Sequence, residues 1–168
     1  MLYVCSLSRL EETVETVGAT HLVTLINADM DVPTPDGINS KNHLFLGFND
    51  ILEPMKGLKP PSDQHVIELL SFLKDWDRAS PLVIHCWAGI SRSTAGAYIA
   101  ACALNPDRCE HEIARELRIQ APSATPNGRL VMMADRLLGR NGRMIDAIRR
   151  IGRGATAFEG DPFEMPLH

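Results

Sequence analysis

Residues 81–104 read PLVIHCWAGISRSTAGAYIAACAL. The short apolar run at 82–85 is typical of a strand buried inside a sheet. Residues 94–104 are rich in alanine and predict a buried helix. A strand, a tight loop and a helix therefore follow one another. Because parallel α/β sheets bind ligands beyond the carboxyl ends of their strands, chemistry is expected in this loop.

Strands alternate with helices on both sides of this stretch. We expect strands at 2–5, 21–26, 43–48 and 82–85, and helices at 9–17, 64–76, 94–104, 108–120, from about 126 to 138, and at 143–151. Residues 27–42 predict a loop, and the tail from 152 is expected to be irregular. The pattern predicts an α/β fold with a small, mostly parallel central sheet flanked by helices and a helical C-terminal half.

Two helix starts carry local signals. Ser8 with Glu11 three residues later predicts a capping box for the first helix. Thr125 followed by Pro126 predicts a cap and a first helical residue, with Gly139 just beyond the end of that helix.

Composition limits the class of protein. The 168 residues suit one domain, 1–168, and 45% hydrophobic with 23% charged residues is typical of globular chains. The net charge is 17 − 21 = −4, which disfavours nucleic acid as a partner. No apolar run approaches the ~20 residues that span a bilayer. Because no basic segment precedes an apolar stretch, we expect no secretory signal and therefore a cytoplasmic protein without a membrane partner.

The loop after the predicted strand has the features of an anion site. Gly89 permits a sharp turn, and amides that point inward at a helix start hold anions. Arg92 at the helix start can grip two oxygens of an oxyanion. Cysteines in such surroundings ionise readily, so we expect Cys86 to be a thiolate that attacks phosphorus and forms a cysteinyl phosphate.

HCWAGISRST at 85–94 resembles the HC-x5-R-[ST] signature of the cysteine-based protein phosphatases, and most closely the dual-specificity and small tyrosine phosphatases. The resemblance extends over about 43–127. It implies that His85 supports the ionised form of Cys86 and that Ser93 donates a hydrogen bond to the sulfur as it leaves. It also implies that phosphate is held by the backbone amides of Trp87, Ala88, Gly89, Ile90, Ser91 and Arg92.

A phosphatase also needs a general acid for the leaving oxygen. Relatives place an aspartate some thirty-odd residues before the cysteine, and Asp50 lies 86 − 50 = 36 residues before Cys86, after a predicted strand. We therefore expect Asp50 to be the acid. The alternatives in the preceding loop are Asp29, Asp31 and Asp36.

Several residues keep two interpretations. Asn127 either fixes the phosphate loop, as a Pro-Asn element does in the family, or simply begins a helix. Cys5 is either structural or forms a reversible disulfide with Cys86, as happens in some relatives. Cys102 and Cys109 are expected to be structural.

Trp87 either packs behind the loop or narrows its rim. The histidines without metal-ligand spacing, expected at the surface, are His43, His65 and His111. No cysteine pair has CxxC spacing, so neither a metal nor another cofactor is expected.

The sequence thus predicts a phosphomonoester hydrolase that acts on protein phosphotyrosine, with phosphoserine and phosphothreonine as further substrates if the pocket is shallow. The partner is then a phosphorylated protein or a small phosphate ester. The loop contains no lysine, which disfavours inositol lipids. A phosphate-binding pseudophosphatase and a rhodanese-like sulfurtransferase are the alternatives. The sequence leaves the oligomeric state open.

Overall fold

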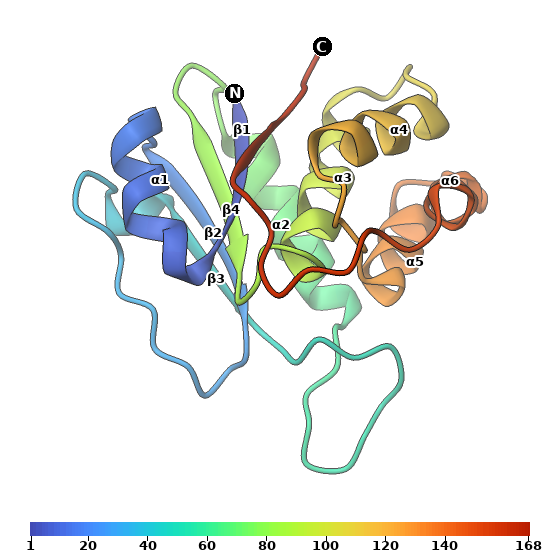
Figure 1. Cartoon of the computed structure of the whole chain (residues 1–168), viewed down its shortest axis with the longest axis horizontal. Coiled ribbons are helices and arrows are strands. Elements are labelled where there is room, and N and C mark those ends of the chain that lie inside the picture. Colours follow the sequence, from blue (N-terminus) through green and yellow to red (C-terminus); the bar gives the residue numbers. More distant parts are fainter.

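A five-stranded sheet forms the centre of the computed structural model, which describes residues 1–168 (Figure 1). Its strands are β1 (Leu2–Ser6), β2 (His21–Ile26), β3 (His43–Gly47), β4 (Leu82–Cys86) and β5 (Phe163–Met165). They lie in the order β3-β2-β4-β1-β5. The first four strands pair in parallel, and β5 joins β1 in the antiparallel direction.

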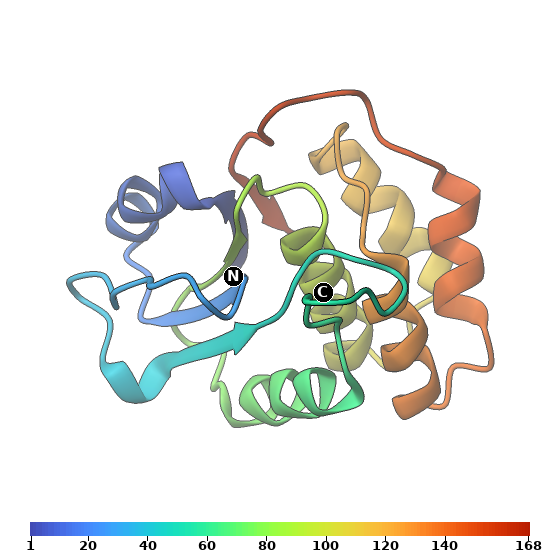
Figure 2. The same ribbon diagram turned by 90° about the horizontal axis from the view of Figure 1, so that it is seen from below.

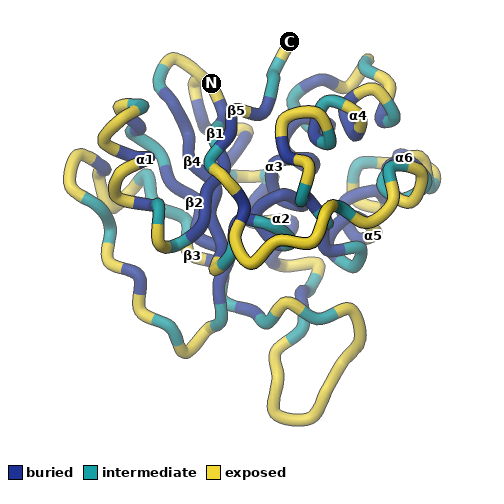
Figure 3. The backbone as a smooth tube through the Cα atoms, in the orientation of Figure 1, coloured by how far each residue is buried: buried dark blue, intermediate teal, exposed yellow.

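Helices cover both faces of the sheet. They are α1 (Leu10–Val17), α2 (Asp63–Asp75), α3 (Arg92–Leu104), α4 (Glu110–Gln120), α5 (Gly128–Leu137) and α6 (Arg143–Ile151). The helix α1 lies on one face, and the other five gather on the opposite side (Figure 1). The sheet and α3 form the buried interior in Figure 3. No helix has the length and apolar character needed to cross a membrane.

The predicted α/β class is confirmed, and so is the mostly parallel sheet. The strand at 21–26 and the helix at 143–151 have the predicted bounds. The main core lies between the sheet and the five helices, and a smaller core of nine buried residues lies under α1. Apolar periodicity predicted these elements well because each one buries a continuous face.

Both predicted helix caps are wrong. A 3-10 turn at Leu7–Arg9 precedes α1, so Arg9 is the N-cap and makes no side-chain cap bond. The Ser8 hydroxyl is hydrogen-bonded instead to the side chains of Ser6 and Glu159. The cap of α5 is Asn127, whose side chain accepts from the amide of Leu130.

The tail from 152 is not wholly irregular, because it contains β5. Figure 2 shows this segment crossing from α6 to the sheet edge, past the loop that follows β4. The amide of Gly160 donates to the carbonyl of Ala88 at 2.8 Å. A Cβ on Gly160 would lie 2.8 Å from the carbonyl oxygen of Gly89. The tail therefore packs directly on the loop that the sequence singled out.

Candidate active site

The candidate site begins where β4 ends. Cys86 is the last residue of β4, Arg92 is the first of α3, and residues 87–91 form the loop between them. Gly89 has φ +71°, and a Cβ there would approach the backbone nitrogen of Ser6 to 2.9 Å. Only glycine combines this backbone with such close packing. The loop is therefore seated against the end of β1.

The Cys86 sulfur lies at the base of this loop. It is 3.1 Å from the hydroxyl oxygen of Ser93, and both residues are buried. The two residues come from adjoining elements, β4 and α3, so their contact follows directly from the local chain path. A hydroxyl at this distance can donate a hydrogen bond to a thiolate.

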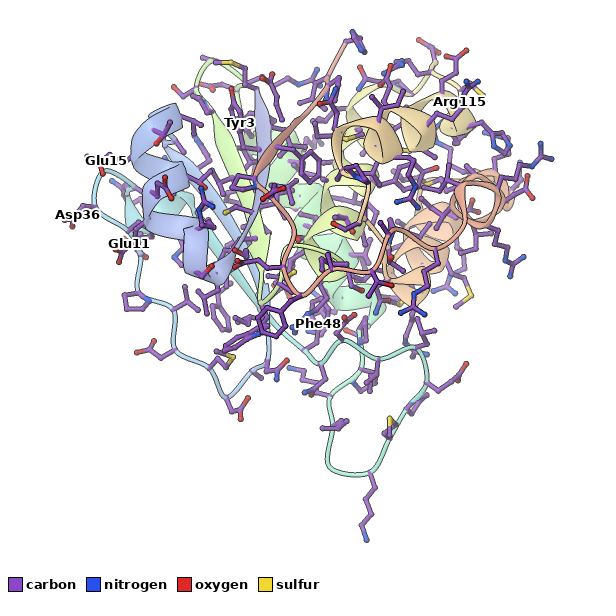
Figure 4. All side chains as sticks on the ribbon, viewed as in Figure 1. Tyr3, Glu11, Glu15, Asp36, Phe48 and Arg115 are labelled. Atoms are coloured by element: carbon purple, nitrogen blue, oxygen red, sulfur yellow. The ribbon has the colours of Figure 1, made fainter.

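Arg92 is held by residues that follow two other strands of the sheet. Its Nη1 donates to the side-chain oxygen of Asn27 and to the carbonyl of Phe48, each at 2.8 Å. Both partners follow the ends of parallel strands, and Figure 4 labels Phe48 at this end of the sheet. Sequence reasoning missed Asn27, although its position directly after β2 is the signal that the strand-end rule uses.

The Nε of Arg92 has no hydrogen-bond partner, and it is the only buried side-chain nitrogen or oxygen in the chain without one. A buried donor without an acceptor costs about 1–3 kcal/mol. Because Nη1 is fixed by protein oxygens, the rest of the guanidinium is left for another acceptor. An oxyanion that accepts two parallel hydrogen bonds fits this need.

Asp50 lies against the loop 87–91. Its Oδ1 accepts from the Ser91 hydroxyl and from the Asn127 side-chain nitrogen, both at 2.8 Å. The backbone amide of Asn127 donates to the carbonyl of Ser91 at 3.2 Å. Asn127 therefore serves both interpretations, since it caps α5 and also contacts the loop. With Oδ1 held by two donors, a proton on this carboxyl group belongs on Oδ2.

The alternative aspartates lie elsewhere. Asp31 and Asp36 line a groove of about 960 Å³ between α1 and the loop 31–37. Asp36 projects at the same edge of the molecule as the α1 residues Glu11 and Glu15 (Figure 4). No hydrogen bond joins Asp29, Asp31 or Asp36 to the loop 87–91. Of these carboxylates, only Asp50 is hydrogen-bonded to the loop between Cys86 and Arg92.

His85 is fully buried next to Cys86. Its Nε2 is 2.8 Å from the Thr24 hydroxyl, and its Nδ1 is 3.3 Å from the carbonyl oxygen of Cys86. Burial lowers the pKa of His85 to about 4, and the nearby charges of His43 and Arg92 act in the same direction. The imidazole is therefore neutral at physiological pH.

The surface location predicted for the other histidines is wrong for two of them. His43 is half-buried between Thr24 and Thr34. His65 is buried, accepts from the amide of Ser62 at the start of α2, and packs on the ring of Phe48. His111 does lie near the surface, 3.3 Å from Asp146.

Strand register separates Cys5 from Cys86. Cys5 pairs with His85, one position before Cys86, so the two sulfurs point to opposite faces of the sheet. Cys5 packs in the core under α1, whereas Cys86 packs in the core beneath α3. Burial raises the pKa of Cys5 to about 12. The geometry thus favours the structural interpretation of Cys5 over a disulfide with Cys86.

The remaining cysteines and Trp87 also have clear positions. Cys102 is buried in α3, which fits the structural role expected of it, whereas Cys109 is exposed before α4 and makes no side-chain cap bond, which does not fit that role. Trp87 is 56% exposed. It therefore belongs to the rim of the site and does not pack behind the loop.

Comparison with known proteins gave one family match and several similar structures. The protein-tyrosine phosphatase family model matches residues 55–125. A search of the curated proteins gave no sequence match. Among solved structures, DUSP15 is 17% identical, with a TM-score of 0.63 over 89% of each chain.

Two further structures have the same fold. The PTP-2 phosphatase of Cydia pomonella is 20% identical, with a TM-score of 0.62 over 79% of this chain and 83% of its own. Human DUSP28 is 17% identical, with a TM-score of 0.62 over 83% of this chain and 92% of its own. The family match and the shared fold confirm the resemblance: the chain is similar to the protein-tyrosine phosphatases over residues 55–125, and it has the fold of the small phosphatases DUSP15 and DUSP28.

Proposed function

We propose that this protein hydrolyses phosphate monoesters through a cysteinyl-phosphate intermediate, with protein phosphotyrosine as the main substrate. The observation that carries the proposal is the buried Nε of Arg92, which has no acceptor within the protein. It belongs to a guanidinium that is held at Nη1 and that lies across the short loop 87–91 from Cys86. A phosphoryl group bound above Cys86 supplies the missing acceptor oxygens.

In the first step the Cys86 thiolate attacks phosphorus and the bond from phosphorus to the ester oxygen breaks. Asp50, protonated on Oδ2, donates its proton to the departing phenolate oxygen. The loop amides and Arg92 stabilise the charge that develops on the equatorial oxygens. The products of this step are tyrosine and a phosphorylated Cys86.

In the second step water attacks the phosphorus, and the bond from phosphorus to sulfur breaks. The Asp50 carboxylate takes a proton from that water, which restores its acid form and releases inorganic phosphate. The Ser93 hydroxyl, 3.1 Å from the sulfur, donates a hydrogen bond to the leaving thiolate. Every group is thereby returned to its starting state.

Two features support phosphotyrosine as the substrate class. The exposed indole of Trp87 offers an apolar face at the rim, next to the nucleophile, for the phenyl ring of the substrate. The loop 87–91 carries no lysine for the extra phosphates of an inositol lipid. A phosphate ester of an aromatic alcohol therefore fits better than a polyphosphorylated headgroup.

The test is hydrolysis of a phosphopeptide panel, inositol phospholipids and p-nitrophenyl phosphate, with a chelator present. We expect turnover that is fastest on phosphotyrosine peptides, lost in Cys86→Ser and unchanged in the matched control Cys109→Ser. Phosphate binding without turnover in the unaltered protein would instead indicate a pseudophosphatase. Sulfur transfer from thiosulfate to cyanide, without phosphate release, would indicate a sulfurtransferase.

A further inference from the structure

A chain of four side chains leads from the surface to the backbone of Cys86. The Thr34 hydroxyl is 2.7 Å from His43 Nδ1, and His43 Nε2 is 2.8 Å from the Thr24 hydroxyl. That hydroxyl is also 2.8 Å from His85 Nε2, and His85 Nδ1 reaches the Cys86 carbonyl oxygen at 3.3 Å. The chain crosses the loop before β3 and then the strands β3, β2 and β4 in turn.

The inner half of the chain has only one consistent direction. A carbonyl oxygen only accepts, so the contact with Cys86 requires the proton of His85 to be on Nδ1. Because His85 is neutral, its Nε2 then carries no proton and accepts from Thr24. The single hydroxyl proton of Thr24 is thereby used.

The outer half follows from the inner half. Since Thr24 has no second proton, its contact with His43 must be donated by His43 Nε2. Burial lowers the pKa of His43, so its ring is neutral and its Nδ1 accepts from the Thr34 hydroxyl. All four donors therefore point toward Cys86.

We propose that Thr24 and His43, supported by Thr34, are positioning residues that act through His85 to favour the thiolate of Cys86. They do so by fixing the tautomer of His85 that donates to the Cys86 carbonyl. That donation withdraws negative charge from the carbonyl oxygen next to the sulfur. The inference rests on the proposed role of Cys86 as the nucleophile.

The groups around the hydrogen-bonded side chains keep His85 neutral. The Arg92 guanidinium from α3 disfavours a second proton on His85, His43 from β3 is neutral, and Cys5 from β1 is buried in its neutral form. The outer end is different, because Thr34 is half-buried and lines the groove beside α1. At neutral pH the His85 and His43 rings therefore stay uncharged, while Thr34 at the outer end of the hydrogen-bond series contacts solvent.

The first test measures the alkylation rate of Cys86 by iodoacetamide as a function of pH, with the modified peptide identified by mass. Thr24→Val keeps the side-chain shape and removes the hydroxyl. We expect it to raise the midpoint of the profile by about half to one pH unit, the effect of one lost hydrogen bond. His43→Leu is expected to give a smaller rise, and His43→Gln to restore the midpoint because its amide still donates to Thr24.

Thr13→Val is the matched control, because Thr13 is also buried and its hydroxyl donates to the carbonyl of Arg9, which takes no part in the hydrogen-bond series from Thr34 to Cys86. Equal midpoints in folded Thr24→Val and Thr13→Val proteins would overturn the proposal. Alkylation reads the thiol directly and does not depend on turnover.

A second readout separates this inference from the proposed function. Nitrogen-proton NMR of the unaltered protein should show the His85 proton on Nδ1, and Thr24→Val should mix the two tautomers. A proton on Nε2 in the unaltered protein would overturn the inference, whatever the enzyme assay gives. The tautomer can be as expected while Cys86 is alkylated no faster than the exposed Cys109. That result would refute Cys86 as the nucleophile. It would also refute the inference, because the hydrogen-bonded side chains would then have no effect on the sulfur.

Discussion

Replacing Asp50 with asparagine isolates the proton that the proposed mechanism needs. The Oδ1 of Asp50 accepts from Ser91 and Asn127, and the asparagine oxygen can accept the same two bonds. The geometry of the loop is thereby kept, while the acidic proton assigned to Oδ2 is lost. Asp50→Ala, by contrast, also removes both bonds and should lower the thermal stability.

The size of the effect follows from the leaving group. A positioned general acid contributes about 10²–10⁴-fold, or about 2.7–5.4 kcal/mol of barrier, when the leaving oxygen needs a proton. A tyrosine phenol ionises near pH 10, so its phenolate needs that proton. We therefore expect Asp50→Asn to slow phosphotyrosine hydrolysis by about 10²–10⁴-fold. An ester with an acidic leaving group should be slowed much less.

The assay compares kcat for phenyl phosphate and for esters of increasingly acidic phenols. The slope of log kcat against leaving-group acidity should become steep in Asp50→Asn, and the fall in kcat at high pH should flatten. Asp36→Asn, in the groove beside α1, is the control. A leaving-group-dependent defect in Asp36→Asn, with Asp50→Asn behaving like the unaltered protein, would refute the placement of the acid.

Three further outcomes follow from the geometry. Arg92→Lys keeps the charge but loses the planar two-point contact, so it should lose most activity and weaken inhibition by vanadate; normal kinetics would contradict the phosphate grip. Gly160→Ala places a Cβ 2.8 Å from the Gly89 carbonyl oxygen, so kcat/KM should fall in a protein that still folds by circular dichroism, whereas the exposed Gly139→Ala should leave kcat/KM unchanged. Burial lowers the pKa of His85 to about 4 from an ordinary value near 6.5, so the unfolded chain binds the proton first. Its contribution to stability is complete above pH 6.5 and is lost as the pH falls to 4, which thermal melts should show as a falling Tm that is flatter in His85→Gln.

The stretch from β4 to α3 was predictable from the sequence because it is local. Cys86, Ser93 and Arg92 lie within eight consecutive residues, and the strand before them and the helix after them fix their arrangement. Asp50 was reached only through the spacing known from the family. Its contact with Ser91 joins residues 41 positions apart, which no local pattern encodes.

The residues that sequence reasoning missed depend on contacts between distant segments. Asn27 reaches Arg92 across 65 residues, and Thr24 meets His85 only because β2 lies beside β4. The Ser8 cap failed for the same reason, because Glu159 lies 151 residues away and binds its hydroxyl. The three-residue β5 is too short for a periodic signal and exists only because the edge of β1 is free to pair.

The contact between Gly160 and the loop 87–91 also has a consequence for synthesis of the protein on the ribosome. Residue 160 follows residue 89 by 71 positions, so at about 5–20 residues per second a ribosome makes it about 4–14 s after the loop. During that interval the nascent chain already carries Cys86 and Arg92, but nothing bonds to the carbonyl of Ala88. The loop therefore completes its hydrogen bonds only once residue 160 has been made, and a chain interrupted before that residue carries Cys86 and Arg92 without this contact.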